Sequence, residues 1–130
     1  MNCQIVVSSP DTGINQYCGK IKNDTDGNFS LMYDEIPGDG LKCRVLINGD
    51  KNSIILKRSG DIKCRMKFCP GQNLPCEYNT PYGFSSFDIY TEKYITKTIA
   101  GGFVVFLEYL IIYNNGDCDN KKLKIEVKYR

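Results

Sequence analysis

The residues of this sequence that could do chemistry together are Glu35 and Arg58, because each ends a row of apolar side chains. Side chains two positions apart in an extended strand share one face. Glu35 therefore continues the face of Tyr33, and Arg58 continues the face of Leu56. A buried charge is costly unless it is paired, so we expect Glu35 and Arg58 to meet each other, or a ligand, inside the fold. The alternative is that both residues end their strands in water.

Two further rows complete the predicted ligand site. Cys76, Tyr78 and Thr80 share a face and would bring two hydroxyls to the end of their row. Met66 has a flexible thioether side chain that adapts to an irregular wall. The predicted ligand-binding residues are Tyr33, Glu35, Arg58, Met66, Tyr78 and Thr80.

Enzyme chemistry is poorly supported, because the chain contains no histidine. The commonest general base is therefore missing, and Ser-His-Asp or Cys-His arrangements cannot be built. Asp34 and Glu35 are adjacent carboxylates, but neighbours in a strand point to opposite faces and do not form a dyad. We predict no catalytic residues, and the sequence favours a non-enzymatic role.

The seven cysteines do not form a recognisable metal or disulfide pattern. There is no Cys-x-x-Cys pair, and the closest spacing is Cys64-x4-Cys69. Without histidine, a structural zinc site would need thiolates or carboxylates alone. An odd count in a chain without a secretion signal favours reduced thiols. We expect no metal and no cofactor, and we interpret Cys43 and Cys64 as small buried apolar residues.

Composition indicates an ordinary globular protein, with 130 residues, 42% hydrophobic residues and a net charge of +2. Basic side chains alternate along two segments, at Lys63, Arg65 and Lys67 and again near the end of the chain. Few aromatic residues interleave with them, as a single-strand-binding groove would require. A polar outer face is what any half-buried strand needs, so we expect no nucleic-acid partner.

Neither a signal peptide nor a membrane helix is expected. Residues 1–8 lack a basic segment followed by an apolar one. The longest apolar run, residues 103–107, is far shorter than the roughly 20 residues of a membrane helix. We therefore expect a cytoplasmic protein with no membrane partner.

Short antiparallel strands are expected to hold these residues. Residues 61–68 alternate apolar and basic side chains, and residues 122–129 repeat the pattern. Turn signals such as Gly38-Asp39-Gly40 and Asn48-Gly49-Asp50 recur about every ten residues. The pattern predicts one all-β domain over residues 1–130: a closed or nearly closed antiparallel up-and-down barrel of about eight to ten strands. A two-sheet sandwich would also satisfy it.

A barrel of about eight strands can be filled by side chains or can hold one small ligand. We therefore predict a small-molecule-binding barrel, and the alternative is a structural or protein-interaction barrel with a filled interior.

One predicted strand, Phe103–Tyr113, is apolar on both faces. Strands of this kind are usually buried on both sides. No amphipathic helix is evident that could cover the outer face. The cover could be an N-terminal segment, a loop or another subunit. Of these we predict a second copy of the chain, which would form a homodimer contact through this strand.

Between Leu31 and Thr91 the chain resembles a known family. The resembling segments are Leu31-Met32-Tyr33-Asp34-Glu35, Leu56-Lys57-Arg58-Ser59-Gly60, Met66-Lys67-Phe68, Tyr78-Asn79-Thr80-Pro81-Tyr82-Gly83 and Tyr90-Thr91. Their order and spacing resemble the YwiB-like family of small bacterial proteins, a calycin-type (lipocalin-like) barrel family of unknown function. The resemblance implies a barrel in the cytoplasm and carries no catalytic residues. The Gly-x-Trp signature of classical lipocalins is absent, since the chain has no tryptophan.

Overall fold

The computed structural model describes residues 1–35 and 40–130, and all the regular structure in these ranges is β-strand. The strands are β1 (Asn2–Ser9), β2 (Gly13–Asn23), β3 (Phe29–Glu35), β4 (Cys43–Gly49), β5 (Ile54–Gly60), β6 (Lys63–Phe68), β7 (Asn73–Thr80), β8 (Gly83–Ile99), β9 (Gly102–Ile112) and β10 (Cys118–Tyr129). Most of the turn predicted at Gly38-Asp39-Gly40 lies outside the described residues. No helix in the described ranges is long and apolar enough to cross a membrane.

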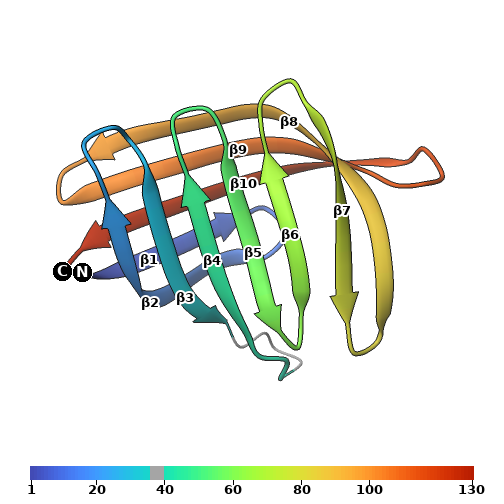
Figure 1. The fold of residues 1–130 in the computed structure, drawn as a ribbon, viewed down its shortest axis with the longest axis horizontal. Coiled ribbons are helices and arrows are strands. Elements are labelled where there is room, and N and C mark those ends of the chain that lie inside the picture. Colours follow the sequence, from blue (N-terminus) through green and yellow to red (C-terminus); the bar gives the residue numbers. More distant parts are fainter. Residues whose placement is uncertain (36–39) are drawn as a thin grey trace.

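Each strand pairs with the next one in the chain, and β1 pairs with β10 to close the barrel (Figure 1). All of these strand pairs are antiparallel. The prediction of a closed up-and-down barrel of about eight to ten strands is confirmed. The sandwich alternative is wrong, because one continuous ladder of hydrogen bonds joins all ten strands.

Two strands lack the clean alternation that marks the others. The residues of β2 are mostly exposed, and Tyr17, Gly19 and Ile21 supply its inward side. Strand β8 is long and changes partner along its length: its first half pairs with β7 and its second half with β9 (Figure 1). An irregularity between Thr91 and Lys93 shifts the register at this change, and a bulge bends a strand and interrupts its alternation.

The core is formed by inward rows from nearly every strand. Ile5, Val45, Ile47 and Val127 are fully buried, and the same rows continue into Phe29, Leu31, Ile54, Phe68, Val105 and Leu107. Alternation along each strand places these residues on one side and polar residues on the other. A polar residue therefore reaches the interior only if it occupies an inward-facing position of its strand.

Candidate functional site: an interior cavity beside a buried ion pair

Glu35 and Arg58 meet on the inner side of the barrel wall. Glu35 is the last residue of β3, Arg58 lies in β5, and β4 separates the two strands. The Arg58 Nε donates to Glu35 Oε1 at 2.9 Å. The side chain of Arg58 is only 21% exposed and that of Glu35 only 15% exposed. The alternative in which both residues end their strands in open water does not describe this geometry.

Two cysteines complete the surroundings of the pair. The thiol of Cys43 donates to the same Glu35 Oε1 at 3.3 Å, and Arg58 Nη1 lies 4.0 Å from the sulfur of Cys64. Burial and the neighbouring Glu35 raise the pKa of Cys43 to about 11. Burial by itself lowers the pKa of Arg58, but the hydrogen bond and charge of Glu35 outweigh it and the net shift is upward. The Arg58 guanidinium therefore stays charged and the Cys43 thiol stays protonated at neutral pH.

A cavity of about 660 Å³ lies beside the pair. Four of the residues predicted from the sequence line it, namely Glu35, Arg58, Met66 and Tyr78. Its apolar walls come from strands on several sides of the barrel and include Val7, Leu56, Phe68, Phe87, Tyr109, Ile111 and Leu123. The lining combines a wide apolar wall with a small number of polar groups, which is the usual composition of a small-molecule site.

A second ion pair lies at the edge of this cavity. Lys121 Nζ, on β10, is 2.6 Å from Asp11 Oδ2, in the β1–β2 connection. Neither residue was among those predicted from the sequence. Lys121 was detectable, because it lies two positions before Leu123 and so shares its inward face. Asp11 gave no such signal, since it belongs to a turn.

Tyr33 lies behind the cavity wall. Its side chain is 4% exposed, and its ring packs against Tyr17 with centroids 4.6 Å apart. Of these two tyrosines, Tyr17 lines the cavity, and it was not predicted from the sequence. Burial and the charge of Glu35 raise the pKa of Tyr33, so its hydroxyl stays protonated. Tyr33 therefore supports the site from behind.

Thr80 does not join the other predicted residues. Its hydroxyl donates to the Gly83 carbonyl at 3.2 Å and accepts from the Tyr82 amide at 3.1 Å. These bonds close the turn between β7 and β8. Local side-chain to backbone bonds of this kind are typical of threonine in turns, and they place Thr80 outside the cavity lining.

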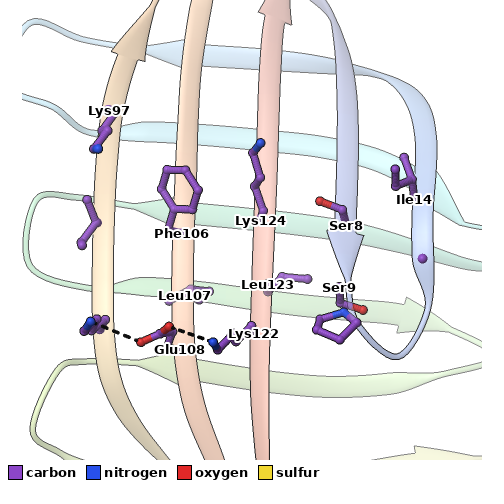
Figure 2. A pocket seen from close by; sticks show the side chains of 14 residues that line it. Ser8, Ser9, Ile14, Lys97, Phe106, Leu107, Glu108, Lys122, Leu123 and Lys124 are labelled. Carbon is purple, nitrogen blue, oxygen red and sulfur yellow. Dashed lines mark ion pairs between the residues drawn. The ribbon is translucent and has the colours of Figure 1, made fainter.

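A second hollow, of about 510 Å³, lies on the outer face of the barrel over β8, β9, β10, β1 and β2 (Figure 2). Paired residues form a row across it: Ile95, Phe106, Lys124, Ser8 and Ile14. The ammonium groups of Lys97 and Lys124 lie 6.0 and 5.8 Å from the centre of the Phe106 ring. This is the outer face of the strand for which the sequence predicts a homodimer contact.

Within the described ranges, no three cysteine, aspartate or glutamate side chains gather into a group that could hold a metal ion. The two acids that line the interior cavity each pair with a basic side chain of the same lining.

Comparisons with known proteins identify a family and a shared fold. Residues 11–125 match the family model described as Domain of unknown function (DUF1934). The chain belongs to this family. None of the proteins with curated descriptions matches it.

A solved structure also resembles the barrel of this DUF1934 member. The crystal structure of the ywiB protein from Bacillus subtilis superposes with a TM-score of 0.76 at 14% sequence identity. The match covers 99% of this chain and 90% of that one. The resemblance to the YwiB-like family stated from the sequence is confirmed, and at this identity the likeness shows a shared fold.

Proposed function

We propose that this protein is a non-enzymatic barrel that binds a small organic molecule in the interior cavity. The observation that carries the proposal is the cavity of about 660 Å³, with its apolar wall and the Glu35–Arg58 pair on one side. Small-molecule sites typically measure about 300–1,000 Å³. The alternative of a barrel with a filled interior has less support, because this cavity is as large as such a site.

Two finer statements belong to the same proposal. A calycin-type (lipocalin-like) relationship is supported by the closed up-and-down topology and by an interior cavity. A cytoplasmic location is supported by cysteine usage, since Cys3, Cys43, Cys64 and Cys76 are buried as unpaired thiols. Disulfides are the usual fate of such residues in oxidising compartments.

The binding test uses N-phenyl-1-naphthylamine, an uncharged dye that becomes fluorescent in apolar surroundings. Val7 lines the cavity, whereas its neighbour Val6 points to the outer face of the same strand. Val7→Trp places an indole in the cavity, and Val6→Trp makes the same change outside. We expect the wild type and Val6→Trp to bind the dye equally, and Val7→Trp to bind at least about tenfold more weakly.

Two results would contradict the proposal. The first is a wild-type protein that gives no fluorescence increase, which would mean that the interior admits no ligand. The second is equal binding by Val7→Trp and Val6→Trp, which would place the dye elsewhere. Circular dichroism of each variant checks that the barrel is intact.

The homodimer through residues 103–113 stays a prediction. Phe106 is half-buried in the outer row, between Ile95 and Lys124 (Figure 2), and a contact between two copies would bury it fully. Phe106→Glu would put a charge into that contact, while Lys97 and Lys124 would compensate it in the monomer. Sedimentation velocity should show a dimer for the wild type and a monomer for Phe106→Glu; a monomeric wild type would end the prediction.

A further inference from the structure

We propose that the end of the ligand beside Glu35 and Arg58 is an uncharged group with a hydrogen-bond donor and acceptor side by side, as in a primary carboxamide. This inference rests on the proposed binding function and names the chemical class of the ligand. A carboxylate or an ammonium is the alternative that the geometry disfavours.

The ion pair leaves some of its hydrogen-bonding positions free. Glu35 Oε1 accepts from both Arg58 Nε and the Cys43 thiol, while Oε2 accepts from no other residue of the described chain. On the arginine, Nη1 has one long contact to Cys64, and Nη2 has no partner among the described residues. The pair therefore offers guanidinium donors next to a carboxylate acceptor. A carboxamide carries the complementary acceptor and donor on one carbon.

The charges that line the cavity are already compensated. The cavity is lined by two acids and three bases, and each acid is paired: Glu35 with Arg58 at 2.9 Å, and Asp11 with Lys121 at 2.6 Å. The third base, Lys122, pairs at 3.6 Å with Glu108, which lies outside the cavity lining. An ionic ligand would therefore enter a site whose charges are already compensated. Burying an ion without its own partner is strongly unfavourable.

The rest of the ligand would face a mostly apolar wall. Leu56 in β5 and its partner Met66 in β6 follow Arg58 along the wall, and Phe68, Phe87, Tyr109 and Ile111 line the remainder. This surface suits an aromatic or aliphatic body attached to the polar end. The tyrosine hydroxyls in the lining are neutral donors and acceptors as well.

The test compares three probes with the same ring: 2-phenylacetamide, phenylacetate and 2-phenylethylammonium. Each has about ten non-hydrogen atoms and is expected to bind at about millimolar concentrations. Binding is measured by chemical-shift titration of ¹⁵N-labelled protein at about pH 7 and about 0.15 M salt. We expect the amide to bind wild type at least about fivefold more tightly than either ion, with shifts at the Arg58 Nε–H.

A charge change provides the internal check. Glu35→Gln removes the compensating carboxylate and leaves Arg58 without its anion, so phenylacetate should become the tightest of the three probes. Asp34→Asn, at the outward-facing neighbour, is the matched control and should keep the wild-type order. Where Glu35→Gln does not fold, Asp11→Asn leaves Lys121 unpaired in the same cavity and should likewise improve phenylacetate binding relative to the amide.

The outcomes separate this inference from the function it rests on. Tightest binding of a charged probe to wild type, or dye binding with no detectable binding of the amide, overturns the carboxamide inference and leaves the binding function standing. A wild-type protein that gives no fluorescence increase with the dye overturns the binding function, and the inference with it. An amide preference that is lost in Val7→Trp supports both.

Discussion

Two neighbouring carboxylates of β3 make ion pairs of equal length on opposite faces of the barrel wall. Asp34 pairs with Arg44 at 2.9 Å on the outside, and Glu35 pairs with Arg58 at 2.9 Å on the inside. The outer side chains are 65% and 58% exposed, whereas the inner ones are 15% and 21% exposed. One step along a strand therefore moves a carboxylate from water into the interior.

The comparison shows that distance alone does not set the contribution of an ion pair. Exposed pairs are screened by water and salt, so they contribute little. In a buried pair, removing one partner strands the other charge in surroundings that cannot solvate it. The inner pair is therefore the place where a single substitution should matter, and the outer pair provides its natural control.

The largest effect is expected from removing the inner carboxylate. Glu35→Ala leaves Arg58 unpaired, and because breaking a buried pair costs about 3–5 kcal/mol, we expect a loss near the lower limit, about 3 kcal/mol. Urea unfolding followed by circular dichroism measures the change. The double variant Glu35→Leu with Arg58→Met should lie within about 1 kcal/mol of wild type, because neither charge is stranded. A Glu35→Ala protein as stable as wild type would show that solvent reaches the pair freely.

A smaller effect is expected from pH, through the thiol beside the inner pair. The native pKa of Cys43 is about 11, against an ordinary value of 9.0. The unfolded chain therefore releases this proton first, and the thiol's contribution to stability is complete below about pH 9 and lost as pH rises toward 11. We expect wild type to lose about 2 kcal/mol more than Cys43→Ala over that window. If the urea midpoints of the two proteins fell by the same amount between pH 9 and pH 11, the burial of this thiol would be contradicted.

The smallest effect is expected at the outer pair. Asp34→Asn removes a charge that water already solvates. The urea midpoint should not change measurably, at low or at high salt. A clear loss of stability, comparable with that of Glu35→Ala, would remove the distinction between the two faces of the wall.

Much of the site was predictable because the face to which a strand residue points depends only on its position along that strand. Glu35 and Arg58 follow apolar rows, and alternation alone sends both to the inner face. The same alternation separates Asp34 from Glu35. Regular turn signals between short alternating runs also determined the all-β class and the antiparallel connections.

Other features depended on contacts that no local pattern encodes. Strand β2 has too few apolar residues to alternate visibly, and the bulge after Thr91 breaks the alternation of β8. Thr80 has the right parity for the cavity, but its hydroxyl bonds within its own turn. Tyr33 has the right parity as well, and Tyr17 from another strand stands between it and the cavity.

The inward direction of these side chains follows from local alternation, because alternation within a strand depends on the backbone alone. Which inward side chains meet depends on the pairing of strands that are distant in the chain. Glu35 and Arg58 are 23 residues apart and come together through the register of β3, β4 and β5. Asp11 and Lys121 are 110 residues apart and meet because β1 pairs with β10 to close the barrel. Closure is a cooperative property of all ten strands, so the cavity and its compensated charges arise only when the whole sheet has formed.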